Sequence, residues 1–319
     1  MSPELKIENK ESRIKPSGYW LIAILISLLG AICFSTKAIF VKLAYRDSDV
    51  DSVTLLALRM LFSLPFFLST AFFSSRKNSN VKFTNKQWLY VAIIGCLGYY
   101  ISSYLDFAGL RYVSAGIERL ILFIYPTFVV LISALWFKEP IKKIQIAALL
   151  ITYAGLLIAF VGEVQINLTG NNFYFGSLCI LLCAVTYAIY IAGSGKLIPV
   201  IGSVKFNSYA MSFACAGVLL HFYLSNKNSL FELPSIVYLY ALGMAIISTV
   251  VPSYLVAISL NRIGANNTAI IASIGPVSTI LQAWYFLGEH VSLWQWLGTI
   301  FILCGVLMIS WKGSSKRGA

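Results

Sequence analysis

The sequence predicts an all-α integral membrane protein of ten transmembrane helices, built as two inverted repeats of five helices each. Three observations predict this fold: the composition, a series of long apolar windows, and a self-similarity at one fixed offset. Of the 319 residues, 59% are hydrophobic and only 11% are charged, with a mean hydropathy of +0.81. A soluble domain averages about 25% charged residues. A soluble core of this length cannot bury so much apolar surface.

Ten apolar windows follow one another along the whole chain. At a rise of 1.5 Å per residue, about 20 residues cross a hydrocarbon layer of about 30 Å. The first window contains Lys37 and has no small-residue cleavage site after it, so we interpret it as an uncleaved span rather than a signal peptide. The expected spans are Trp20–Tyr45, Ser52–Phe73, Gln87–Leu110, Ser114–Phe137, Ile141–Gly162, Tyr174–Lys196, Phe206–Leu224, Ile236–Leu260, Asn266–Gly288 and Leu293–Trp311.

The two halves of the chain resemble each other at an offset of 150 residues. This shift aligns, without a gap, Pro126 with Pro276, Glu139 with Glu289 and Gly155 with Gly305. Because five spans is an odd number, the second half must insert upside down, which is the arrangement that carriers use to open alternately to either side. The expected organisation is a tail (1–19), the first repeat (20–162), an external linker (163–173), the second repeat (174–311) and a tail (312–319).

The positive charges orient the chain in the membrane, because cytoplasmic loops hold the excess of Lys and Arg. With the amino terminus inside, 17 of the 24 Lys and Arg residues fall on the cytoplasmic side, 4 fall outside and 3 lie within spans. Both termini are therefore expected in the cytoplasm. We attribute the net charge of +12 to this orientation signal and to contact with anionic lipid head groups, and we expect no nucleic-acid partner.

The orientation can be tested with single cysteines at Ser79 and Gly170, introduced into a variant that lacks the six native cysteines. A membrane-impermeant thiol reagent is expected to label position 170 in intact cells and position 79 only after lysis, because the two loops lie on opposite sides. The reverse labelling pattern would contradict the orientation.

Two long stretches make the family resemblance visible. DFAGLRYVSAGIERLILFIYPTFVVLISALWFKEP and LNRIGANNTAIIASIGPVSTILQAWYFLGEH begin near Asp106 and Leu260. Together with ten spans in two halves, they resemble the EamA-type transporters of the drug/metabolite transporter superfamily, over essentially the whole chain from Trp20 to Trp311. One departure is Lys138 before Glu139, where the family pattern has Gly. The resemblance implies a plasma-membrane exporter of amino acids or related small metabolites, with a central cavity between the halves.

Five ionisable residues occupy one layer in the outer half of the membrane. Counting from the span ends places them at similar depth on four consecutive spans: Lys37, Arg59, Asp106, Glu118 and Arg119. Each charge costs roughly 2.5–3.5 kcal/mol near the middle of the bilayer, so such residues usually pair or bind a ligand. The spans of the second half carry no equivalent charges.

Two interpretations of this layer remain open. Pairs such as Glu118 with Arg59, or Asp106 with Arg119, could join helices. Alternatively the layer binds substrate. Three bases against two acids leave one base unmatched, and we expect Lys37 to take a substrate carboxylate while Glu118 or Asp106 accepts an ammonium group. Because burial disfavours a charged carboxylate, Glu118 and Asp106 are also candidates to carry a coupling proton.

Polar, aromatic and proline residues complete the candidate site. We expect Tyr99 and Tyr125, on spans three and four, and Gln282 and Trp284, near the end of span nine, to contribute to substrate binding. Pro126 and Pro276 are hinge candidates, because a proline within a helix frees a backbone carbonyl one turn earlier.

Other classes of protein fit the sequence less well. No HExxH or GxSxG motif is found, and Cys179 and Cys183 share a helix face without a nearby His or acid, so we expect no enzyme activity, no cofactor and no metal. A channel or a lipid-flipping protein is the weaker alternative, and a nucleotide-sugar or sugar-phosphate exchanger of the same superfamily is the runner-up. The remaining expected partners are a small-molecule substrate and the lipid bilayer. A homodimer is compatible with the sequence, which carries no signal for oligomeric state.

Overall fold

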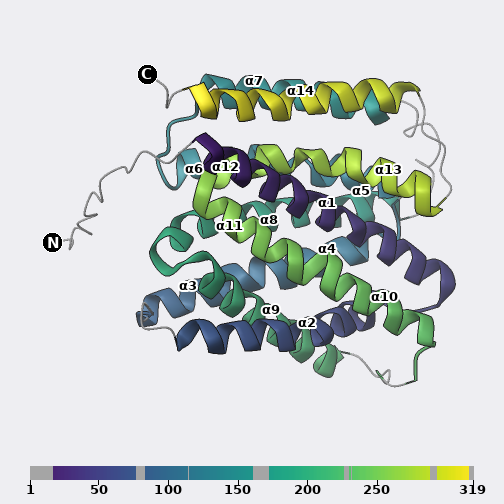
Figure 1. Cartoon of the computed structure of the whole chain (residues 1–319). Helices are drawn as coiled ribbons and strands as arrows, with labels where there is room; N and C mark the ends of the chain where they lie inside the picture. Colours follow the sequence, from purple (N-terminus) through teal and green to yellow (C-terminus); the bar gives the residue numbers. More distant parts are fainter. Residues whose placement is uncertain are drawn as a thin grey trace.

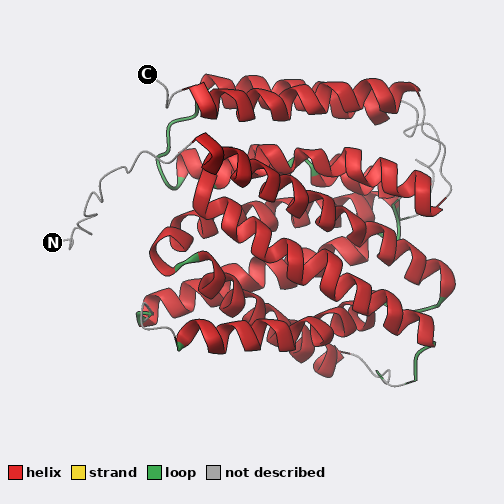
Figure 2. Ribbon diagram, viewed as in Figure 1, coloured by secondary structure: helices red, strands yellow, loops and turns green. Residues whose placement is uncertain are grey.

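The described part of the chain is helical, as predicted. The computed structural model describes residues 17–76, 83–113, 115–160, 172–225, 230, 232–287 and 293–315, and these ranges contain helices, turns and short loops but no strand (Figure 2). Seven helices are long and apolar enough to cross a membrane, and three shorter apolar helices accompany them. The predicted ten-helix fold class is confirmed. Most of the predicted linker 163–173 lies outside the described residues. Positions 79 and 170, which the labelling experiment uses, also lie outside them.

Each predicted span corresponds to one helix or to a helix interrupted by an irregular turn. The first repeat contains α1 (Ser17–Asp47), α2 (Ser52–Ser75), α3 (Asn85–Gly95) continued by η1 (Cys96–Ile101) and α4 (Ser102–Gly109), α5 (Ala115–Leu122), α6 (Tyr125–Leu135) and α7 (Lys143–Phe160). The second repeat contains α8 (Phe173–Ile201), α9 (Ser203–Ser225), α10 (Ser235–Ala245) continued by η2 (Ile246–Val250) and α11 (Val251–Ile263), α12 (Ala265–Ile271), η3 (Ala272–Ile274), α13 (Gly275–Leu287) and α14 (Leu293–Ser315).

The irregular turns repeat at the same offset as the sequence. The π-helical turns η1 and η2 interrupt the third and eighth spans at equivalent places. The fourth span breaks between Leu122 and Tyr125, and the ninth narrows to the 3₁₀ turn η3 at the corresponding position. Pro126 and Pro276 both lie in the first turn after the break. A backbone N–H in the first turn has no acceptor within the helix, so a proline there costs no hydrogen bond. The two repeats therefore share the positions of their irregular turns as well as the number of their helices.

The two repeats pack against each other through their long first helices. Helix α1 packs on α11 and α13 of the second repeat, and α8 packs on α4 and α6 of the first repeat (Figure 1). Helices α7 and α14 lie side by side at the edge of the bundle (Figure 1). Gly155 and Gly305, which the sequence aligned, both lie at this contact, where a Cβ atom on either would overlap the other helix. Small residues let the two backbones approach closely.

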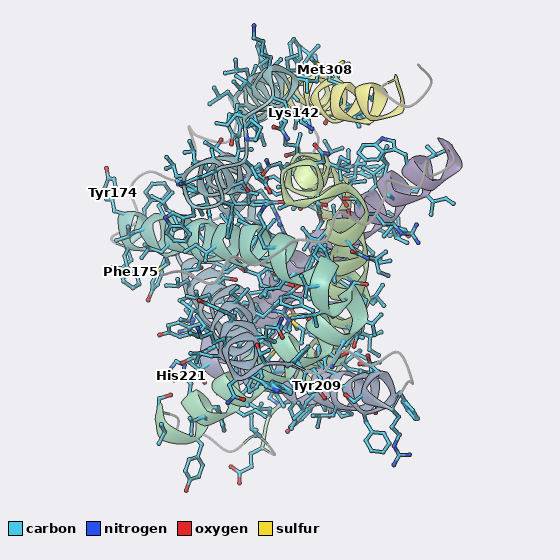
Figure 3. The ribbon with its side chains drawn as sticks, turned by 90° about the vertical axis from the view of Figure 1, so that its left-hand side faces the viewer. Lys142, Tyr174, Phe175, Tyr209, His221 and Met308 are labelled. Atoms are coloured by element: carbon cyan, nitrogen blue, oxygen red, sulfur yellow. The ribbon has the colours of Figure 1, made fainter. Side chains whose placement is uncertain are left out.

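Large apolar side chains cover the outside of the helix bundle. Tyr174 and Phe175 point away from the bundle (Figure 3), and Leu135 and Trp136 at the end of α6 are likewise exposed. In water such a surface would be unstable, whereas lipid chains cover it without cost. The protein is a multi-pass membrane protein.

Candidate functional site

A cavity of about 80 Å³ lies inside the bundle and is lined by residues of both repeats. Five of the predicted site residues line it: Lys37, Arg59, Tyr99, Arg119 and Tyr125. The second repeat contributes side chains from α8, α11, α12 and η3, among them Tyr187 and Thr268. Small-molecule pockets usually have about 300–1,000 Å³. A ligand the size of an amino acid therefore fits only after the repeats have moved apart.

The buried acids and bases do not form the two ion pairs that the sequence suggested. Lys37 Nζ lies 2.6 Å from Asp106 Oδ2, which joins α1 to α4. Arg119 Nε lies 3.0 Å from Oε2 of its chain neighbour Glu118. Side chains of adjacent residues on a helix diverge, so this second contact is an ion pair without a well-directed hydrogen bond. The pairing of Glu118 with Arg59 and of Asp106 with Arg119 is therefore wrong.

Arg59 is the base of this layer that has no acid within ion-pair distance in the described part of the chain. The side chain is buried, with 1% of its surface exposed, and its guanidinium lies over the Phe107 ring at 5.5 Å. Its Nε donates to Thr249 Oγ1 at 2.6 Å, while Ser103 Oγ lies 3.5 Å from one Nη. The prediction that Lys37 is the unmatched base is wrong, because Asp106 holds Lys37, and Arg59 is unmatched in its place.

The two π-helical turns contribute one partner of Arg59 and one residue of the cavity lining. Thr249 lies in η2, and its hydroxyl donates to the carbonyl of Met244, five residues earlier, so that an oxygen lone pair remains for the Arg59 Nε. Tyr99 lies in η1 of the other repeat, and Gly98 beside it lets α8 approach, because a Cβ there would overlap the Tyr190 ring. Such turns widen a helix locally and are frequent at functional sites.

A row of aromatic rings forms part of the cavity wall. The rings follow one another at centroid distances of 5.0–6.3 Å, in the order Phe34, Tyr99, Tyr190, Tyr187, Tyr125 and Phe123. Five of these six side chains line the cavity, and Tyr190 lies behind them. The Tyr125 hydroxyl donates to the carbonyl of Ala269 at 3.3 Å, which links the first repeat to the second. Such a wall can hold an apolar or planar group beside the charged layer.

The remaining predicted site residues lie outside the cavity lining. Asp106 and Glu118 are fully buried behind Lys37 and Arg119. The Gln282 amide donates to Ser278 Oγ at 2.8 Å and to the carbonyl of Ile32 at 3.4 Å. Trp284 is 54% exposed on the outer face of α13. Neither Gln282 nor Trp284 is brought to the charged layer in this conformation.

The hydroxyl partners of Arg59 carry no signal that the sequence could have shown. Thr249, which accepts from Arg59, and Ser103, which lines the cavity, are small hydroxyl residues among many in apolar spans. Tyr187 had one signal, because the repeat offset aligns it with Lys37, but the offset does not show that both point inward. Within the described residues, no group of His, Cys, Asp or Glu side chains has an arrangement that could hold a metal ion.

A second cavity, of about 370 Å³, lies one helical turn further along α8 and α12. Its lining is mixed and includes the polar side chains of Gln145, Asn266 and Asn267. Glu139, from the end of the fourth span, lies in this lining and forms an ion pair with Lys196 of α8 at 2.6 Å. The cavity therefore lies beside an ion pair that joins the two repeats.

The two five-helix repeats, with a cavity between them that is lined by charged side chains, are typical of a membrane transporter. The chain belongs to the EamA-like transporter family, whose model matches residues 21–161 and 174–311, one copy for each repeat. The resemblance read from the sequence is thereby confirmed.

The chain is similar to proteins that are named as transporters. The chain is 30% identical to the uncharacterized transporter YcbK of Bacillus subtilis, over 97% of this chain and 99% of that protein. It is 22% identical to the uncharacterized inner membrane transporter YicL of Salmonella typhimurium, over 89% and 93% of the two chains. A crystal structure of a protein with 17% sequence identity has the same fold, with a TM-score of 0.74 over 94% of this chain and 99% of that chain.

Proposed function

We propose that the protein exports amino acids or related small carboxylate metabolites by alternating access. The observation that carries this proposal is Arg59, a buried cation that faces the central cavity with no acid partner in the described residues. Holding an unpaired charge in the bilayer is costly, and a substrate carboxylate would offset that cost. A guanidinium matches the planar geometry of a carboxylate.

The charge of the site favours a carboxylate over a phosphate. Lys37 and Arg119 already have carboxylate partners, which leaves one unmatched positive charge in the described layer. A phosphate dianion usually needs two or more free bases. The aromatic row then supports an apolar side chain of the substrate, while the carboxylate lies at Arg59.

Contacts between the repeats at both ends of the bundle support alternating access. At one end, the Tyr240 hydroxyl of α10 donates to Asp47 Oδ2 of α1 at 2.6 Å. At the other end, Lys196 pairs with Glu139, and Tyr209 of α9 contacts Ser75 of α2 at 2.7 Å. Opening to either side would break one set of contacts and keep the other. We place the Glu139 end in the cytoplasm, with both termini, and the protein in the inner membrane, in line with the charge distribution of its loops.

Counterflow in liposomes that contain the purified protein tests this function. Labelled L-phenylalanine, L-leucine and L-threonine would be offered outside vesicles preloaded with the same unlabelled compound, with UDP-glucose as the phosphate-bearing comparison. We expect saturable, preload-accelerated entry of at least one amino acid, because a carrier returns faster when it is loaded. No acceleration is expected for UDP-glucose.

Two results would contradict the proposal. Flux that rises linearly with concentration and ignores the preload would indicate a channel. Counterflow of UDP-glucose alone would favour the runner-up, an exchanger of nucleotide sugars.

A further inference from the structure

The second cavity, at the end of the bundle that carries Glu139, has room for a small molecule and reaches the surface. Its volume of about 370 Å³ lies within the roughly 300–1,000 Å³ of small-molecule sites. Ser133 and Gln145 on its lining are buried, whereas Pro140 and Lys142 are exposed. A ligand can therefore enter this cavity while the two repeats remain in contact, which the smaller central cavity does not allow.

The charges that line the second cavity differ from those of the central cavity. Among the described residues, Glu139 and Lys142 are its charged lining residues, one acid and one base. The central cavity is lined by three bases and no acid in the same part of the chain. Lys142 has no acid within ion-pair distance among the described residues. One acid and one base complement a molecule that carries both an ammonium group and a carboxylate, as an α-amino acid does.

Amide groups in this lining have hydrogen-bonding capacity that the protein leaves unused. The Gln145 side chain is 4% exposed, and its Nε2 approaches Asn267 Oδ1 only at 3.5 Å. The Oδ1 atom of Asn266 is buried and has no partner within the described residues. A buried polar group without a partner raises the free energy of the folded state. A ligand carboxylate would accept from the Gln145 amide, and a ligand ammonium would donate to Asn266 Oδ1.

The acid of this cavity also joins the two repeats. Glu139, between α6 and α7 of the first repeat, pairs with Lys196 of α8 in the second repeat at 2.6 Å. Both side chains are partly open to solvent, with 44% of Lys196 and 40% of Glu139 exposed. An ion pair that is open to solvent is weak. A ligand ammonium can therefore compete with Lys196 for Glu139, and its binding would remove one contact between the repeats.

The two cavities are neighbours inside the bundle. Consecutive residues line them on two helices: on α8, Ile191 lines the central cavity and Ala192 the second, and on α12, Thr268 lines the central cavity and Asn267 the second. A ligand that leaves the second cavity inward therefore has a short way to Arg59 once the repeats part.

We infer that the second cavity is an entry site for a zwitterionic amino acid, whose ammonium group takes Glu139 from Lys196 and whose carboxylate binds Lys142 and the Gln145 amide. Loss of the ion pair weakens the contact between the repeats at this end, and the ligand favours the conformation in which they part. The amino acid then moves to the central cavity, where Arg59 takes its carboxylate. This inference rests on the proposed function, which places the Glu139 end in the cytoplasm, where an exported substrate enters.

Equilibrium dialysis of the full chain in mixed micelles tests the entry site. Labelled L-phenylalanine, L-leucine and L-threonine are offered to Arg59→Met, which lacks the carboxylate contact of the central cavity. We expect one molecule of at least one amino acid to remain bound per chain. Adding Glu139→Gln should weaken this binding at least tenfold, because a charged hydrogen bond is lost. Adding Lys196→Met should tighten it about two- to fivefold, because the competitor for Glu139 is gone. Glu232→Gln, in an exposed loop, is the matched control and should change nothing.

Analogues that lack one charge test the zwitterion. Phenethylamine and hydrocinnamate, which lack the carboxylate and the ammonium group of L-phenylalanine respectively, are offered as unlabelled competitors of the bound amino acid. Each should compete at least tenfold more weakly than L-phenylalanine does. Competition by either analogue as strong as that by L-phenylalanine would overturn the zwitterion site.

The outcomes separate this inference from the proposed function. Counterflow of an amino acid by the parent, without binding to folded Arg59→Met, would overturn the entry site and leave the carrier intact. Weaker binding after both Glu139→Gln and Lys196→Met, or no change after either, would also overturn it. Binding that follows the expected pattern, without counterflow of any amino acid, would overturn the proposed function and leave the site. If Arg59→Met does not fold, as judged by size-exclusion chromatography, the opposite effects of Glu139→Gln and Lys196→Met on binding by the otherwise unchanged chain decide.

Discussion

Replacing Arg59 by Met is expected to lower L-phenylalanine transport at least tenfold. The substitution keeps an apolar stem of similar length and removes the cation of the layer that lacks an acid partner. A hydrogen bond to a charged group contributes about 1.5–3 kcal/mol, and about 1.4 kcal/mol corresponds to a factor of ten. Phenethylamine, which has no carboxylate and should be a poor substrate of the parent, is expected to change less than twofold.

The matched control is Arg76→Met at the exposed end of the same helix, which should transport as the parent does. Labelled uptake into liposomes measures both variants, with the amount of folded protein checked by size-exclusion chromatography. A folded Arg59→Met that transports L-phenylalanine at the parent rate would place the carboxylate elsewhere.

Breaking the Lys37–Asp106 pair from the acid side should strongly destabilise the fold. Asp106→Leu leaves the Lys37 ammonium without its partner, with only 12% of its side chain exposed. Removing one partner of a buried ion pair costs about 3–5 kcal/mol, whereas an apolar pair of similar volume is often neutral. The double variant Lys37→Met with Asp106→Leu is therefore expected to recover most of the lost stability. Denaturant titration in mixed micelles measures the free energy of unfolding.

The comparison of single and double variants distinguishes pairing from simple loss of packing. A double variant no more stable than Asp106→Leu alone would mean that Lys37 and Asp106 do not depend on each other. As a matched pair on a half-exposed surface, Glu139 and Lys196 should show little coupling, because ion pairs open to solvent contribute about 0–1 kcal/mol.

Most of the fold could be predicted from the sequence, because a bilayer imposes one length and one composition on every span. The ten apolar windows predicted the helices. The sequence also aligned Gly155 with Gly305, and in the structure both glycines lie where α7 and α14 pack against each other. The π-helical turns could not be predicted. Neither CLGYYI nor IISTV contains a residue that forces a wide turn, and each turn depends on the helices packed around it.

The gathering of the five ionisable residues could be predicted from the sequence, but their pairing could not. Position along a span indicates roughly how far a charge lies from the span ends, and in the structure Lys37, Arg59 and Arg119 line one cavity with Asp106 and Glu118 beside them. Which base meets which acid depends on how each helix is rotated about its axis, and that rotation is set by packing. The sequence predicts similar depths for Lys37 and Arg59, yet one contacts Asp106 and the other contacts Thr249 of the opposite repeat.

The contact between Lys37 and Asp106 also has a consequence for biogenesis. The ribosome delivers α1 to the membrane before it has made α4, so Lys37 must enter the bilayer region before its partner exists. An unpaired lysine at that depth costs roughly 2.5–3.5 kcal/mol by insertion scales. Long side chains near a helix end can reach the interface, but Lys37 is too far from either end of α1 to do so easily. We therefore expect the first two spans to insert stably only after the third span supplies Asp106, so that cotranslational insertion is cooperative over the first three spans.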